Sequence, residues 1–191
     1  VHAAAGEPWD DVVAAAVERG WAGLECLSGI PGSVGATPIQ NVGAYGQDVS
    51  ETITRVTALD TRGGDTVAFT NEECRFGYRD SRFKQADHGR VLITGVSFRL
   101  PLGGPPAVRY AELERALHES GTASPTLADV RRTVLALRRR KSMVFDPDDE
   151  NRHSLGSFFM NPVVSKETCA AVQDRALGVT ASAATGMPLW P

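Results

Sequence analysis

The sequence predicts an α+β protein, a class in which helices and strands occupy different stretches of the chain. Helical periodicity marks one segment near the N-terminus and two more after residue 105. Between them, β-branched and polar residues alternate as they do in half-buried strands. Because helices and strands do not alternate strictly, a doubly wound parallel sheet is disfavoured.

Five segments of secondary structure are predicted before residue 142, each from its own pattern. Residues 8–20 predict a helix, because a proline suits the first helical position and a glycine ends the segment. Residues 52–70 predict a hairpin, since alternating stretches flank a Gly-Gly pair. A nearly continuous apolar run at 90–100 predicts another strand. Residues 110–121 predict a short helix closed by a glycine, and 124–141 predict the most strongly periodic helix. The apolar stripe of that last helix consists of Leu127, Val130, Val134 and Leu137.

A polar, acidic stretch at 146–154 predicts a domain boundary. We assign residues 1–147 to a first domain and 148–191 to the start of a second, smaller one, with a final helix beginning near Ser165. The chain begins without Met and ends at "MPLWP", which leads us to expect a segment of a longer protein.

Composition excludes several classes of partner. The formal net charge of −3 gives no reason to expect nucleic acid or an anionic membrane. The uncharged run from Cys26 to Gln47 could span a bilayer by length, but its prolines and amides exclude that. Cys26, Cys74 and Cys169 are far apart, which disfavours a disulfide framework or a zinc site and favours a reducing cytoplasm. The four histidines show no ligand spacing either, so no metal is expected.

The stretch "GIPGSVGATPIQNVGAYG", residues 29–46 and hereafter the glycine run, concentrates backbone freedom without charge. Glycine permits positive φ and close approach to a bulky ligand, and successive bare N–H groups form concavities that bind anions. The spacing matches neither the dinucleotide fingerprint nor the P-loop. By spacing alone, a ligand-binding loop and a set of tight turns that only reverse the chain are about equally supported.

Two further clusters carry chemistry. In "GYRDSRFK", Arg79 supplies a planar fork suited to a carboxylate and Tyr78 supplies a ring and a hydroxyl. Taken alone, this pattern is more typical of a solvated basic loop. In "GSFFMNP", Ser157 lies between a glycine and two phenylalanines, a water-poor setting for a hydroxyl that donates a proton. It lacks the frame of a hydrolase elbow, and a buried structural serine is the more common outcome.

Together these segments resemble the UDP-N-acetylenolpyruvoylglucosamine reductase family, the flavin enzymes of peptidoglycan precursor synthesis. The matching pieces occur in the family's order over nearly the whole chain: "AGEPWDDVV", "GLECLSGIPGSVGATPIQNVGAYG", "ECRFGYRDSRFK", "RYAEL" and "GSFFMNPVVS". The resemblance implies the FAD-binding fold shared with vanillyl-alcohol oxidase, followed by a smaller substrate domain.

The resemblance also implies roles for individual residues. The glycine run would wrap FAD, and its implied contacts are Gly29, Ile30, Pro31, Gly32, Ser33, Val34, Gly35, Asn41, Gly43, Ala44, Tyr45 and Gly46. Arg79 and Ser157 would be catalytic, Arg79 by stabilising the substrate carboxylate and Ser157 by protonating a substrate carbon. The implied substrate contacts are Tyr78, Tyr110, Arg140 and Asn161.

The implied reaction has two halves. NADPH passes a hydride to FAD, and the flavin then reduces UDP-N-acetylglucosamine enolpyruvate to UDP-N-acetylmuramate, an oxidoreductase step that cell wall biogenesis, cell shape and cell division depend on. We expect a cytoplasmic, monomeric parent enzyme without nucleic-acid or membrane partners.

The chain departs from the family's pattern in three places. The family has a phosphate-binding glycine loop upstream of "AGEPWDD", and this sequence starts after that loop. The family has a glutamate near its C-terminus that assists the protonation step, and this sequence stops before it. Met143 and Val144 stand where the family often has a lysine. Another FAD oxidoreductase of the same fold, or a flavin- or nucleotide-sugar-binding module without turnover, is therefore a rival interpretation. Retention of both Arg79 and Ser157 favours a catalytic parent.

Overall fold

The computed structural model describes residues 1–153 and 160–180. Its largest element is a four-stranded antiparallel sheet in the order β1-β6-β4-β5. The hairpin of β4 (Ile53–Asp60) and β5 (Thr66–Thr70) confirms the prediction for 52–70, with Leu59 opposite Thr66 and the turn passing through Gly64 at φ +78°. Strand β6 (Val91–Phe98) confirms the prediction for 90–100.

Strand β1 (His2–Ala4) was not predicted, because three residues are too few to show a period. It forms by pairing with β6, in the register His2 opposite Ser97, and Ala5 N–H extends the contact to Thr94 O at 3.0 Å. A partner 95 positions away in sequence therefore creates this strand.

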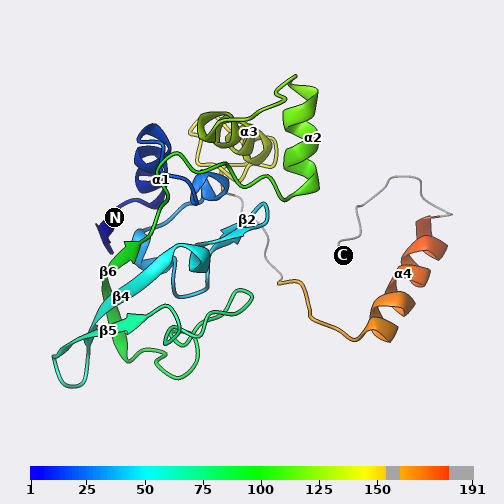
Figure 1. Cartoon of the computed structure of the whole chain (residues 1–191). Helices are drawn as coiled ribbons and strands as arrows, with labels where there is room; N and C mark the ends of the chain where they lie inside the picture. The colour runs from blue at the N-terminus through cyan, green and yellow to red at the C-terminus, as the bar shows by residue number, and fades with distance from the viewer. Residues whose placement is uncertain (154–159, 181–191) are drawn as a thin grey trace. The chain divides into compact units, whose positions relative to one another are not determined.

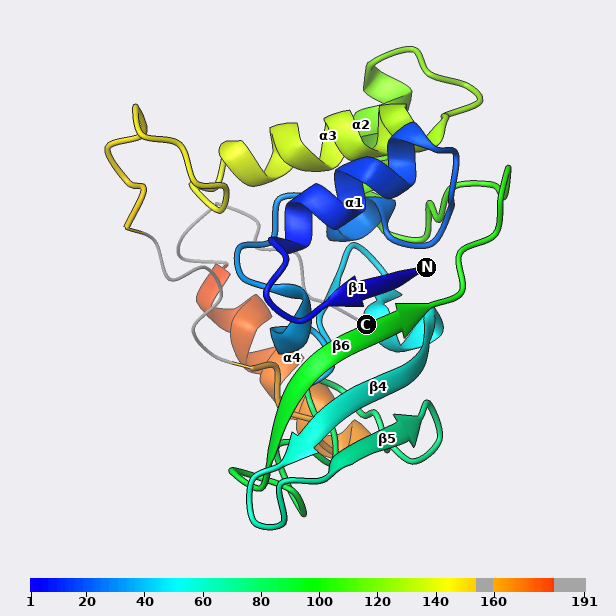
Figure 2. The same ribbon diagram turned by 90° about the vertical axis from the view of Figure 1, so that its left-hand side faces the viewer.

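The three helices α1 (Trp9–Glu18), α2 (Ala111–Glu119) and α3 (Leu127–Arg139) confirm the helices predicted from periodicity. Glycines at positive φ follow α1 and α2, as the sequence indicated. A capping box between Thr126 and Asp129 begins α3. Figures 1 and 2 show the three helices gathered on one side of the sheet.

Two hydrophobic clusters make up the core. The first joins the sheet to α1 and to the glycine run, and includes Trp9, Val13, Val34, Val56 and Val96, all 1% exposed or less. The second lies between α2 and α3 and contains Val130, Val134 and Leu137 of the predicted stripe together with Leu113, Leu117 and Cys26. The fourth residue of the stripe, Leu127, is also buried, at 8% exposed.

The glycine run and its flanks fold into short elements that periodicity could not predict. These are the 3-10 turns η1 (Glu25–Leu27), η2 (Val34–Ala36) and η3 (Val49–Glu51), and a small hairpin of β2 (Gly43–Ala44) and β3 (Gln47–Asp48). Turn η1 contacts α1 and α3, whereas η2 contacts β1 and β6. The run therefore passes from the helical layer to the sheet.

The chain divides into two units, Val1–Gly156 and Ser157–Pro191. The described part of the second unit contains helix α4 (Lys166–Thr180), which confirms the helix predicted to begin near Ser165. The Ser165 hydroxyl accepts a hydrogen bond from the Thr168 N–H at 3.2 Å, so Ser165 caps this helix.

Candidate functional site

The N-terminal segment holds the first half of the glycine run in place. Trp9 N–H donates to Gly32 O, Val34 N–H donates to Glu7 O, and Gly35 N–H donates to Ala5 O, each at 2.9 Å. A Cβ on Gly35 would lie only 2.7 Å from that of Ala5, so glycine permits this approach. These contacts hold "AGEPWDD" and the glycine run side by side although they are apart in sequence.

Asp10 anchors the beginning of the run. Its carboxylate accepts the Gly29 N–H at 2.6 Å and both terminal nitrogens of Arg131 at 2.7 and 2.8 Å. Burial alone would raise the pKa of Asp10, but these hydrogen bonds and the charges of Arg131 and Arg138 outweigh it and lower the pKa. Asp10, in the first turn of α1, therefore joins α1 to α3 and to the run.

Residues 30–33 of the run offer backbone donors. Pro31 and Gly32 are exposed, and nothing lies within 4 Å of the position where a Gly32 Cβ would stand. Within the part of the chain that the structure describes, nothing accepts a hydrogen bond from the backbone N–H of Ile30, Gly32 or Ser33. Exposed, uncharged backbone with free N–H groups is the arrangement that binds anions.

The remaining residues of the run differ in burial. Gly29, Val34 and Asn41 are buried, Gly46 is exposed, and the half-buried members are Ile30, Ser33, Gly35, Gly43, Ala44 and Tyr45. The Asn41 side chain is engaged within the protein, because it donates to Gly77 O at 2.9 Å and accepts from the Ser50 N–H at 3.1 Å.

Arg79 lies directly against the second half of the run. Its Nη1 donates to Asn41 O at 3.1 Å and to Asp48 Oδ1 at 3.2 Å, and its Nη2 donates to Gly43 O at 2.5 Å. The guanidinium also lies 5.2 Å from the centroid of the Tyr78 ring, which is half exposed. The structure thus brings Arg79 and Tyr78 together with the run, and Arg79 is not the freely solvated arginine of a surface loop.

Tyr110 meets the other end of the run. Its ring packs edge to face on Tyr45 with centroids 5.4 Å apart. Burial, with the nearby charge of Glu112, raises the pKa of Tyr110 to about 12, and burial likewise raises the pKa of Tyr45. Both rings are therefore neutral hydrogen-bonding groups at physiological pH.

The carboxylate of Glu25, which the sequence analysis missed, is buried and joins segments that are distant in the sequence. Glu25 is 1% exposed and accepts N–H groups from Ala107 at 2.8 Å, from Gly23 at 2.7 Å and from the Gln47 side chain at 3.4 Å. Gln47 in turn accepts the Cys26 N–H at 3.0 Å. The available signal was that Glu25 directly precedes the long uncharged run and Gln47 is its last residue.

The remaining predicted residues are Ser157, Asn161 and Arg140. Ser157 lies outside the described residues, and Asn161 is exposed in the second unit. Arg140 is exposed at the end of α3, near enough to Tyr45 for its positive charge to oppose the rise in the pKa of Tyr45. Their predicted roles stay predictions.

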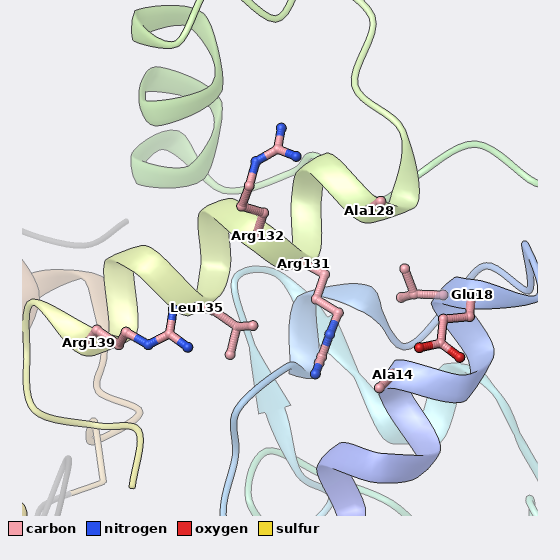
Figure 3. Close-up of a pocket in the computed structure, with 8 residues that line it drawn as sticks. Ala14, Glu18, Ala128, Arg131, Arg132, Leu135 and Arg139 are labelled. Carbon is pink, nitrogen blue, oxygen red and sulfur yellow. The ribbon is translucent and has the colours of Figure 1, made fainter. Parts of the chain in front are cut away.

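A separate groove of about 340 Å³ lies between α1 and α3 and is lined by neither Arg79 nor the glycine run. Figure 3 shows Arg131 pointing between the two helices and Arg132 pointing away from α1. Arg131 is paired with Asp10 and Arg132 with Asp129, so two of the three arginines that line this groove are engaged in ion pairs.

Comparison with known proteins identifies the class. A family model described as an FAD binding domain matches residues 1–70, which include the whole glycine run. A crystal structure of UDP-N-acetylenolpyruvylglucosamine reductase from Thermus caldophilus aligns with a TM-score of 0.56 at 22% identity, covering 93% of this chain and 54% of that one. The fold and the run thus define an FAD-binding domain, and FAD is its cofactor.

Curated relatives identify the family. UDP-N-acetylenolpyruvoylglucosamine reductase of Streptomyces coelicolor is 53% identical over 98% of this chain, and that of Salinispora arenicola is 50% identical over 100%. The enzyme of that name from Mycobacterium tuberculosis H37Rv is 48% identical over 100% of the chain. The chain belongs to the UDP-N-acetylenolpyruvoylglucosamine reductase family, and it spans about half the length of these relatives, 49 to 52%.

The residues present fit FAD. The open space at Gly32 and the free N–H groups of Ile30, Gly32 and Ser33 suit the oxygens of a diphosphate or a flavin ring, and no charged side chain interrupts the run. These residues are the ones in this chain that would hold the cofactor.

Proposed function

We propose that the complete protein reduces UDP-N-acetylglucosamine enolpyruvate to UDP-N-acetylmuramate with NADPH as reductant. The observation that carries the proposal is the position of Arg79, held by Asn41, Asp48 and Gly43 on the stretch that the FAD-binding match covers. Membership of the family and the chemistry of Arg79 point to the same substrate.

FAD, held by the glycine run, would supply the hydride chemistry that links NADPH to the enolpyruvyl double bond. Negative charge then develops on the substrate carboxylate and the adjacent carbon. Arg79 stabilises that charge by donating hydrogen bonds from its N–H groups to the carboxylate, an interaction worth about 3 kcal/mol for a well-placed donor. Ser157 protonates the carbon as general acid.

The other predicted substrate contacts orient the ligand. Tyr110, with its neutral hydroxyl, closes over the substrate, and Tyr78, Arg140 and Asn161 bind its remaining polar groups. Ile30, Gly32 and Ser33 hold the cofactor through their backbone N–H groups.

The proposal extends to the setting of the enzyme, a cytoplasmic monomer in peptidoglycan precursor synthesis without nucleic-acid or membrane partners. The three cysteines are free thiols, which supports a reducing compartment. Among the helices of residues 1–153 and 160–180, none has the length and apolar character needed to cross a membrane.

Stopped-flow absorbance of the flavin in the complete enzyme tests the proposal, because it separates the two half-reactions. NADPH should reduce the flavin, and the enolpyruvyl substrate should reoxidise it. Ser157→Ala should slow reoxidation by at least about 10²-fold while reduction by NADPH keeps its rate. Arg79→Lys should also slow reoxidation, because lysine keeps the positive charge but cannot form the bidentate pair with the substrate carboxylate.

A reduced flavin that the enolpyruvyl substrate does not reoxidise would refute the proposed activity. Equal slowing of both half-reactions by Ser157→Ala would refute the role of Ser157 as acid. Weak flavin binding with no turnover in the complete protein would favour a binding module instead.

A further inference from the structure

Asp48 stands at the junction of β3 and η3 and makes two kinds of contact. Its side chain caps η3 in a capping box with Glu51, and its Oδ1 accepts a hydrogen bond from Arg79 Nη1 at 3.2 Å. The Arg79 side chain is 26% exposed and that of Asp48 is 44% exposed. An ion pair with this exposure contributes little to stability, typically about 0.2–1 kcal/mol, so stability does not explain the contact.

The contact with Asp48 uses only some of the N–H donors of the Arg79 guanidinium. An arginine has five N–H donors. Asn41 O and Asp48 Oδ1 accept hydrogen bonds from Nη1, and Gly43 O accepts one from Nη2. The described residues take no hydrogen bond from Nε or from the second Nη2 hydrogen. Nε and Nη2 share one edge of the guanidinium, and a two-nitrogen edge is what a carboxylate binds in a bidentate pair.

The surrounding backbone is arranged for this placement. Arg79 and Asn41 both have positive φ, +52° and +44°, which is unfavourable for residues with a Cβ and is maintained here by the contacts between the two loops. A Cβ on Gly43 would overlap Asp48 Oδ1 and lie 2.5 Å from Arg79 Nη1. Glycine at 43 therefore makes room for the Arg79–Asp48 pair, a use of this glycine that does not involve the flavin.

We propose that Asp48 is a positioning residue, which holds the Arg79 guanidinium so that its Nε–Nη2 edge stays available to the carboxylate of the substrate. The inference rests on the proposed function, in which Arg79 binds that carboxylate. Of the three acceptors on Arg79, Asp48 is the one contributed by a side chain, so it is the one that a substitution can remove.

Two variants of Asp48 in the complete enzyme separate positioning from helix capping. Asp48→Asn and Asp48→Ser both keep an N-cap residue for η3. The asparagine also keeps an oxygen that accepts from Nη1 at the same reach, whereas serine is too short. A difference between the two variants therefore reports on the contact with Arg79.

Calorimetric titration of the oxidised enzyme provides a readout without turnover. Asp48→Ser should weaken binding of the enolpyruvyl substrate about tenfold, while binding of UDP-N-acetylglucosamine, which lacks the carboxylate, should change less than about twofold. Flavin reoxidation in Asp48→Ser should slow by about ten- to a hundredfold, as expected for a misplaced substrate-binding group. Asp48→Asn should lie within about threefold of the wild type in both measurements.

Two controls complete the experiment. Asp129→Asn changes an acid that also joins a capping box and pairs with an arginine, but far from Arg79 in sequence, and it should change neither measurement. In an Arg79→Lys background, Asp48→Ser should have no further effect beyond about twofold, because the partner is already lost.

The inference is overturned if Asp48→Ser behaves like Asp48→Asn, or if it weakens both UDP ligands equally. If Arg79→Lys itself leaves reoxidation and substrate binding unchanged, the proposed role of Arg79 fails, and the inference fails with it. If Arg79→Lys impairs both and Asp48→Ser impairs neither, only the inference about Asp48 fails.

Discussion

Replacing Glu25 by glutamine tests how the buried carboxylate supports the site. Oε1 of Glu25 accepts from Ala107 and Gln47, and Oε2 accepts from Gly23. A glutamine has one oxygen and one NH₂ group, so with its oxygen at the first position it turns a donor toward the Gly23 N–H. An orphaned N–H of this kind costs about 1–3 kcal/mol.

The net change should be a loss of about 2 kcal/mol in the free energy of unfolding. Weaker hydrogen bonds to a neutral acceptor add to the cost, whereas removal of a buried charge offsets part of it. Glu25→Ala leaves all three donors without a partner and a cavity besides, so it should cost about 4 kcal/mol or more. That is a large share of the roughly 5–15 kcal/mol that stabilises a domain, so Glu25→Ala can prevent folding altogether. Glu25→Gln is therefore the more informative change.

Urea-induced unfolding followed by tryptophan fluorescence measures both effects. Glu51→Gln is the matched control, because Glu51 is 40% exposed and pairs with Arg109 at 2.8 Å on the surface. It should cost less than about 1 kcal/mol. If Glu25→Gln and Glu51→Gln have the same free energy of unfolding within about 0.5 kcal/mol, the reasoning about buried donors is wrong.

Three further changes test other contacts. The pKa of Asp10 is lowered in the folded state, so its contribution to stability is present above the unfolded pKa near 3.8 and is lost as the pH falls through the folded value. In acid denaturation curves, the stability advantage of the wild type over Asp10→Asn should therefore shrink below about pH 4. An advantage that does not depend on pH would contradict this prediction. Burial, together with the charge of Glu25, raises the pKa of the Cys26 thiol to about 12. At pH 8 a thiol reagent should therefore modify the half-buried Cys169, while Cys26 should react only on unfolding. Mass spectrometry of the modified peptides measures which of the two cysteines has reacted. Gly43→Ala should displace the Arg79–Asp48 pair and lower the free energy of unfolding by about 1–3 kcal/mol. Gly6→Ala is the control and should not destabilise the protein, because nothing lies within 4 Å of the added carbon. Equal unfolding midpoints for the two variants would contradict the close approach at Gly43.

The sequence by itself determined the helices and the long strands. Local patterns were sufficient for α1, α3 and the β4–β5 hairpin, because an amphipathic period and a Gly-Gly turn are properties of consecutive residues. Family membership was also present in the sequence, since the segments that carry it are continuous and ordered along the chain.

Only the tertiary structure decided which side chains meet. Asp10 and Arg131 are 121 positions apart, Glu25 and Ala107 are 82 apart, and Arg79 reaches Gly43 across 36. The last of these contacts joins two loops that pass through positive φ at Asn41 and Arg79, and such loops have no repeating sequence pattern from which the contact could be predicted. A side chain that serves a turn locally, as Asp48 does in capping η3, gains its second partner only when folding brings a distant loop within hydrogen-bonding distance.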